Sequence, residues 1–175
     1  MGTGAGMSDS KLPDFQGGAE HASNVAIAAL SGANIIYESA GMYASLLSTC
    51  PESLILDNDL LGGCMRMVKG LTVNKETLGF DVIKDVCLNS KGHYLGSDQT
   101  LNVMQTEYIY PELYNRLSPG DWHDAGKPIA LEMAIKKTQE ILASHFPTHI
   151  SEETDNLIRK NFPIFLNKEA IGRDK

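Results

Sequence analysis

Residues 32–45, GANIIYESAGMYAS, decide the fold of this chain, because the character of the sequence changes twice within them. An alanine-rich helical run over residues 24–30 stops at the glycine that opens the stretch. Residues 35–37 are β-branched or aromatic and too few for a helix, and residues 38–41 bring small side chains and one carboxylate. Helix, glycine stop, buried strand and polar loop together form the unit of a parallel α/β fold.

The loop after this strand is the first place to look for a site. In parallel α/β folds, the loops at the carboxyl ends of the strands carry ligands and chemistry. Tyr37, Glu38 and Ser39 occupy that place in this chain. We therefore expect a binding site to begin with these side chains.

Composition and charge narrow the function classes. The 175 residues suffice for one domain with a sizeable core. A net charge of -7 and a pI near 5.2 argue against nucleic acid or an anionic membrane as partner. No apolar run is long enough to span a membrane and the N-terminus does not resemble a signal peptide, so we expect a cytoplasmic protein. Three widely spaced cysteines predict reduced thiols, with no disulfide framework and no metal site.

Most of the chain is predicted to be helical. Residues 1–14 are dense in turn chemistry and are expected to form a loop, and their glycine spacing is not a dinucleotide fingerprint. Helices are expected at residues 15–31 (capped by Asp14), 58–69 (capped by Asp57), 74–88 (capped by Asn74), 97–107 (capped by Asp98 or Ser97), 128–146 and after Ser151, with a helical turn at 43–47 and a turn at 119–122. Two short parallel strands do not make a stable sheet alone. The pattern therefore fits either a helical domain with a strand hairpin or a piece of a larger α/β protein.

Three polar side chains outside the central stretch have two interpretations each. Glu20 and His21 lie together in the first predicted helix, where they form either a general acid/base pair or a solvated, cap-stabilised pair. His93 lies in the glycine-bounded loop 91–97, beside a tyrosine, and acts there either in catalysis or as a structural hydrogen-bonding group.

Six stretches of the chain form a series with a characteristic order and spacing: residues 4–14 (GAGMSDSKLPD), 17–29 (GGAEHASNVAIAA), 32–42 (GANIIYESAGM), 55–62 (ILDNDLLG), 77–86 (TLGFDVIKDV) and 92–101 (GHYLGSDQTL). Together they resemble the C-terminal third of the trimethylamine methyltransferase family, the corrinoid-dependent methylamine and quaternary-amine methyltransferases.

The resemblance implies a fold and a reaction. Family members are TIM barrels that transfer a methyl group from an amine to the Co(I) corrinoid of a partner protein. The implied fold class is α/β, the C-terminal part of a TIM barrel, mostly helical with one to three short parallel strands. Residues 1–175 would form this segment, with a loop at 1–14, βα units at 15–150 and a C-terminal helix and tail at 151–175. We expect the isolated chain to be inactive.

The resemblance also bears on the substrate and the cofactors. Relatives that use quaternary amines tend to have His-Asp where this chain has Tyr37-Glu38, which favours trimethylamine or a similar methylated amine. The expected substrate-binding residues are Tyr37 and Tyr43 as cation–π walls, Glu38 as the charge, and His93. The corrinoid belongs to the partner protein, and the pyrrolysine of the trimethylamine branch is absent from this sequence. We hypothesise that the chain is the reading frame downstream of the amber codon for that residue. The catalytic residues are not identified.

A second function class stays open. The chain is alternatively a non-catalytic helical module that binds a corrinoid protein or associates with itself as a homo-oligomer. An incomplete barrel would expose sheet edges and an apolar interior, which favours self-association.

Overall fold

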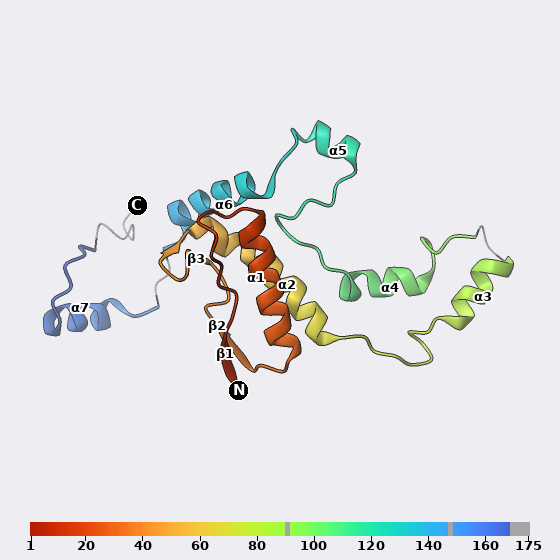
Figure 1. Ribbon diagram of the computed structural model, residues 1–175, viewed down its shortest axis with the longest axis horizontal. Coiled ribbons are helices and arrows are strands. Elements are labelled where there is room, and N and C mark those ends of the chain that lie inside the picture. Colours follow the sequence, from red (N-terminus) through yellow and green to blue (C-terminus); the bar gives the residue numbers. More distant parts are fainter. Residues whose placement is uncertain (90–91, 147–148, 169–175) are drawn as a thin grey trace.

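The computed structural model describes residues 1–89, 92–146 and 149–168, and it is mostly helical with short strands (Figure 1). The helices are α1 (Phe15–Leu30), α2 (Pro51–Lys69), α3 (Phe80–Asn89), α4 (Asp98–Glu107), α5 (Pro119–Asp124), α6 (Ala130–Ser144) and α7 (Glu152–Asn161). The strands are β1 (Gly2–Gly4), β2 (Ile35–Tyr37), β3 (Met42–Tyr43) and β4 (Ser48–Thr49).

A β1–α1–β2 unit begins the chain. The two strands pair in parallel, with Gly2 opposite Ile35 and Gly4 opposite Tyr37. The expectation of a loop throughout residues 1–14 is therefore wrong at residues 2–4. Glycine has a poor intrinsic preference for strands, but here the backbone pairs with an apolar strand that is distant in sequence. The parallel pair confirms the α/β unit expected around residues 32–45.

The pairing continues beyond β1 and β2 after an interruption. Met7 forms a parallel bridge with Met42, the amide of Ser8 donates to the carbonyl oxygen of Met42 at 3.0 Å, and the amide of Ala44 donates to Ser10 at 2.9 Å. The register differs from that of β1 and β2, because residues 38–41 loop out between the two paired parts. The loop that follows β2 is thus held at both ends by the N-terminal segment.

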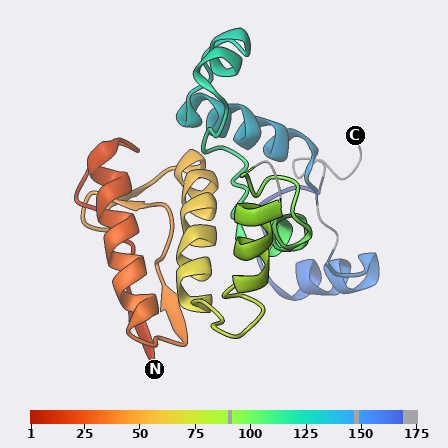
Figure 2. The ribbon, with the colours of Figure 1, turned by 90° about the vertical axis from the view of Figure 1, so that its right-hand side faces the viewer.

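Helix α1 begins and ends where the sequence predicts. The Asp14 carboxylate accepts from the amide of Gly17 at 3.0 Å and from the hydroxyl of Ser10 at 2.8 Å. These two hydrogen bonds, the one to Gly17 first, lower the pKa of Asp14. Helix α1 packs against α2, and α2 also packs against α6 (Figures 1 and 2). The buried apolar side chains include Val25 of α1, Cys64 of α2 and Ala134 of α6.

Two elements near α2 differ from the prediction. Helix α2 begins at Pro51 rather than after Asp57, because Pro51 occupies the first turn, where its missing N–H costs nothing. Asp57 therefore lies inside the helix and does not cap it. Residues 44–47 form the turn of the β3–β4 hairpin rather than a helical turn, and Ala44, Ser45 and Leu46 all have positive φ.

The later helices also differ from the prediction at their starts. The Asn74 side chain accepts from the amide of Thr77 at 2.8 Å within a turn, and α3 begins only after Gly79, which has φ +62°. The Trp122 indole donates to the carbonyl oxygen of Pro128 at 2.9 Å, which keeps Pro128 outside α6. Residues 119–124 form the short helix α5 where a turn is expected. Of the two caps expected for α4, Ser97 rather than Asp98 occupies the position, and the cap Ser151 of α7 is confirmed.

We predict opposite effects for alanine at two adjacent glycines of α1. A Cβ at Gly17 would lie 2.7 Å from Cε1 of Tyr43, whereas a Cβ at Gly18 would meet nothing within 4 Å. Gly18→Ala should stabilise the fold by about 0.5–1 kcal/mol because alanine favours the helix. Gly17→Ala should destabilise it by about 1–2 kcal/mol because the overpacked ring outweighs that gain. Urea unfolding of both variants measures the difference, and equal effects would contradict the packing described.

Candidate functional site

The candidate site lies on the face of the β1–β2 sheet that α1 does not cover. Side chains two residues apart on a strand share a face, so Ile35 and Tyr37 lie opposite Ile36. Ile36 is half-buried, whereas Tyr37 is 54% exposed. Glu38 follows at the carboxyl end of β2 and is also exposed. The sheet thus presents an aromatic ring and then a carboxylate to the surface.

The glycines of β1 form the floor beneath these two side chains. A Cβ built on Gly4 would lie 3.2 Å from Cε2 of Tyr37 and 3.2 Å from Oε2 of Glu38. A Cβ on Gly2 would lie 3.5 Å from Cε1 of the same ring. The Tyr37 ring therefore extends across β1, and the Glu38 carboxylate meets it above Gly4.

The Glu38 carboxylate is available for a ligand. Within the described part of the chain, it makes no hydrogen bond and no ion pair. Its backbone has φ 64°, a conformation that a non-glycine residue adopts at a cost of about 1–2 kcal/mol. An unpaired carboxylate near an aromatic ring is an arrangement that attracts a cation.

Tyr43 is buried, whereas Tyr37 and Glu38 are exposed. It is only 4% exposed, and its ring centroid is 4.8 Å from that of His21 at an interplanar angle of 52°. Burial, followed by the negative charge of Asp57, raises the pKa of Tyr43 to about 12. The ring packs against His21 and Gly17 of α1, and its expected contribution to a cation-binding wall stays a prediction.

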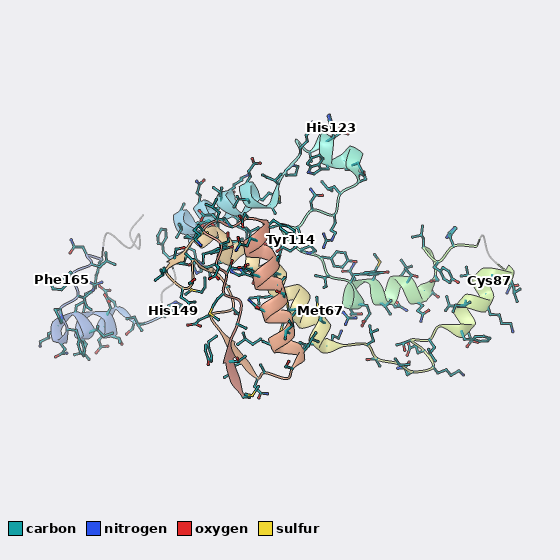
Figure 3. The ribbon with its side chains drawn as sticks, in the orientation of Figure 1. Met67, Cys87, Tyr114, His123, His149 and Phe165 are labelled. Carbon is teal, nitrogen blue, oxygen red and sulfur yellow. The ribbon has the colours of Figure 1, made fainter. Side chains whose placement is uncertain are left out.

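His93 lies far from Tyr37, Glu38 and Tyr43. It is exposed in the segment between α3 and α4, which Figure 1 shows at the far side of the molecule from β2. Figure 3 marks the separation: Cys87, near the end of α3, lies at the right-hand end, whereas the strands lie left of Met67. A role for His93 in the same site stays a prediction. Residue 91, the first of its predicted loop, lies outside the described residues.

Glu20 and His21 face different surroundings. The Glu20 carboxylate accepts from the Ser8 hydroxyl at 2.6 Å, the Asp9 amide at 2.8 Å and the Gln16 side chain at 3.0 Å. The Ser8 and Gln16 hydrogen bonds, followed by that from Asp9, lower the pKa of Glu20. Glu20 therefore fixes the loop before α1, which favours the stabilising interpretation over an acid/base pair.

A buried ion pair lies directly under the loop 38–41. His21 is 0% and Asp57 is 3% exposed. Nδ1 of His21 is 3.0 Å from Oδ1 of Asp57, and Nε2 is 3.0 Å from the carbonyl oxygen of Met42. Because a carboxylate and a carbonyl only accept, both ring nitrogens donate and the ring is an imidazolium. The second Asp57 oxygen accepts from the amide of Gly41 at 2.7 Å.

The pKa of His21 reflects opposing effects. Burial lowers it, but the hydrogen bond to Asp57, the hydrogen bond to the Met42 carbonyl and the Asp57 charge outweigh burial, and the pKa is raised above its usual 6.5. Sequence reasoning singled out His21 but missed Asp57, which it assigned to a helix cap. The signal available was an aspartate six residues after a helix-initiating proline, inside an apolar run.

The described residues offer no evident metal centre. Among them, no group of three His, Cys, Asp or Glu side chains is arranged to hold a metal ion. Within the same residues, none of the helices combines the length and the apolar character that crossing a membrane requires.

The comparison with known proteins identifies the family. A family model described as trimethylamine methyltransferase (MTTB) matches residues 1–165. The chain belongs to this family. The resemblance read from the sequence is thereby confirmed.

Individual relatives cover nearly the whole chain but are much longer than it. Trimethylamine methyltransferase MttB of Methanosarcina barkeri (strain Fusaro) is 34% identical over 146 residues, which are 83% of this chain and 29% of the relative. Glycine betaine methyltransferase of Desulfitobacterium hafniense (strain Y51) is 29% identical over 153 residues, 87% of this chain and 31% of the relative. Trimethylamine methyltransferase MttB2 of Methanosarcina mazei is 34% identical over 139 residues, 79% of this chain and 27% of the relative. The chain spans about 30% of the length of these relatives.

The buried ion pair makes stability depend on pH with a definite sign. Because folding raises the pKa of His21, the pair's contribution is complete below about pH 6.5 and is lost as the pH rises through the higher, folded pKa. Asp57→Asn should remove this dependence and cost about 1–3 kcal/mol at pH 6. Urea unfolding at a series of pH values measures both effects.

The matched control for this prediction is His123→Gln. His123 is exposed and lies 3.5 Å from the exposed Asp124, so its ion pair should contribute little at any pH. If the free energy of unfolding of the unmodified chain rose between pH 6.5 and 8, the assignment of an imidazolium at His21 would be contradicted.

Proposed function

We propose that this chain is the C-terminal segment of a TIM-barrel methyltransferase that moves a methyl group from trimethylamine, or a similar methylated amine, to the Co(I) corrinoid of a partner protein. Membership of the family supports the reaction class. The observation that carries the proposal is the convergence of the Tyr37 ring and the free Glu38 carboxylate above Gly4, at the carboxyl end of a parallel strand. Ligands bind at that end of the strands in TIM barrels.

The two side chains suit a cationic amine. Trimethylamine is protonated near neutral pH, and an ammonium over the face of an aromatic ring gains about 0.5–2 kcal/mol. The Glu38 carboxylate neutralises the charge of the bound ammonium. In the reaction the C–N bond breaks, its electron pair leaves with the amine, and the methyl group passes to the corrinoid. Glu38 stabilises the charged substrate more than the neutral product, so activation comes from other residues of the barrel.

The same carboxylate disfavours glycine betaine. Betaine carries its own carboxylate, which Glu38 would repel at close range. One family relative is a glycine betaine methyltransferase, so this choice of substrate separates members of one family. The proposal assigns this chain to the methylamine branch.

A second function is supported by the exposed apolar surface. Phe15, Leu47 and Phe165 are each more than four-fifths exposed, and Ile35 lies open on the uncovered sheet face. Exposed apolar surface and free strand edges favour association with another chain. The chain would then act as a non-catalytic module that binds itself or a corrinoid protein.

We predict that the isolated chain transfers no methyl group. The experiment incubates it with trimethylamine and a Co(I) corrinoid protein, with a full-length family member as the active control, and follows methylation of the corrinoid spectroscopically. Activation requires groups beyond Tyr37 and Glu38, so only the full-length protein should react. Transfer by the short chain would show that the whole site lies within these residues. Sedimentation of the same sample tests self-association.

Glu38→Gln should weaken binding of trimethylammonium about fivefold, the loss expected for one exposed ion pair of about 1 kcal/mol. The same variant should bind glycine betaine no more weakly than the unmodified chain, because the repulsion is gone. NMR titration with each ligand measures both affinities. Glu132→Gln, a change of the same kind on the exposed surface of α6, is the control. An unchanged trimethylammonium affinity would exclude Glu38 as the counter-charge.

A further inference from the structure

We infer that Asp57 and His21 are positioning residues for the amine site, because they fix the backbone of the loop that carries Glu38. The inference rests on the proposed function. Neither side chain reaches the surface where the amine would bind, since both are buried. They act through the backbone of the loop 38–41 and of Met42, the first residue of β3.

Two contacts hold the loop at its far end. The Asp57 Oδ2 atom accepts from the Gly41 amide at 2.7 Å, and Nε2 of His21 donates to the Met42 carbonyl oxygen at 3.0 Å. The bond between Nδ1 of His21 and Oδ1 of Asp57, at 3.0 Å, joins these two contacts into one unit. The pair therefore fixes the backbone of two successive residues, Gly41 at the end of the loop and Met42 at the start of β3. We call this pair of hydrogen bonds the clamp.

The near end of the loop is held by the sheet. The amide of Ala5 donates to the Tyr37 carbonyl oxygen at 3.3 Å, which ties the end of β2 to the N-terminal segment. At the start of the loop, Glu38 has φ 64°. For a residue with a side chain, such a conformation persists only when the surroundings determine it.

Closely packed neighbours leave the loop no alternative path. A Cβ at Gly6 would lie 2.8 Å from the Ser39 carbonyl oxygen, and a Cβ at Gly41 would lie 2.6 Å from Cδ2 of Leu54. The loop is thus confined by Gly6, in the segment that follows β1, on one side and by Leu54 of α2 on the other. Without these hydrogen bonds, the backbone at Gly41 would no longer be fixed, and the Glu38 carboxylate would no longer be held near Gly4.

The chain contains a matched control for Asp57. Asp59, on the same helix, accepts from the backbone amides of Glu112, Leu113 and Tyr114 at 3.1, 2.7 and 3.2 Å. It fixes the backbone of a different segment in the same way. Removal of either carboxylate costs backbone hydrogen bonds, but only Asp57 acts on the loop of the proposed site.

The experiment compares the unmodified chain with Asp57→Ala, Asp57→Asn and Asp59→Ala. NMR titration with trimethylammonium chloride, followed at Tyr37 and Glu38, gives the affinity, with uncharged tert-butanol as the ligand control. Hydrogen exchange of the Gly41 amide reports the clamp itself. Asp57→Ala should weaken trimethylammonium binding about tenfold, which is the usual loss when a residue that orients a binding group is removed. The same substitution should speed hydrogen exchange of the Gly41 amide by a similar factor.

The other variants separate positioning from general stability. Asn at position 57 can accept from Gly41 with its oxygen and donate to a neutral His21 with its nitrogen, so it should restore the affinity to within about twofold. Asp59→Ala should leave the affinity unchanged. If Asp57→Ala does not fold, His21→Gln replaces it, because one amide nitrogen cannot span the two opposite acceptors of the ring, and the expected loss of affinity is the same.

Each outcome decides the inference. An unchanged affinity in Asp57→Ala or in its substitute His21→Gln, or an equal loss in Asp59→Ala, would overturn the positioning role and leave the proposed function intact. Failure of the unmodified chain to bind trimethylammonium more tightly than tert-butanol would overturn the proposed function, and the positioning role with it.

Discussion

One buried carboxylate joins the parts of this chain that carry its site. Asp57 of α2 contacts His21 of α1 and the amide of Gly41 after β2, so a single charge links two helices and a loop. A charge without partners in such surroundings would cost several kcal/mol, since it has left water. The arrangement of α1, α2 and the loop therefore depends on both contacts of this carboxylate being made. The three groups come from α1, the loop after β2, and α2, all within residues 15–69.

The segment around the proposed site contains several residues with a strained backbone and is held by backbone hydrogen bonds. Glu38 adopts positive φ, as do the three consecutive residues at 44–46 in the next turn. Each such residue costs about 1–2 kcal/mol. Backbone hydrogen bonds from the N-terminal segment to residues 42–45 accompany this strain, including those that join Ser8 to Met42 and Ser10 to Ala44. Apart from Lys127 before α6, the described non-glycine residues with positive φ all lie within residues 38–46.

Sequence patterns predicted correctly those elements whose start or type is set by neighbouring residues in the chain. Asp14, Ser97 and Ser151 mark helix starts because a cap acts on its own next turn, and the apolar run at residues 35–37 marks β2. Strand β1 was missed because its pairing partner lies more than thirty residues away and its own glycines favour turns. Asp57 was misplaced because the cap and the buried ion pair use the same residue type, and only the packing of α1 on α2 distinguishes them. Of the predicted site residues, Tyr37 and Glu38 lie together because they are neighbours in the sequence. Tyr43 is buried and His93 is distant, because their positions depend on how separate elements pack, which local sequence patterns do not reveal.

The floor of the proposed site is bare backbone. Gly2 and Gly4 place no side chain between the Tyr37 ring and the strand below it. The room available to a ligand is therefore set by residues that contribute nothing to the hydrophobic core. A single methyl group at position 4 would shift the ring and the carboxylate together, without disturbing α1 or α2. Substrate size could thus diverge among relatives through one strand position, at little risk to the fold that supports it.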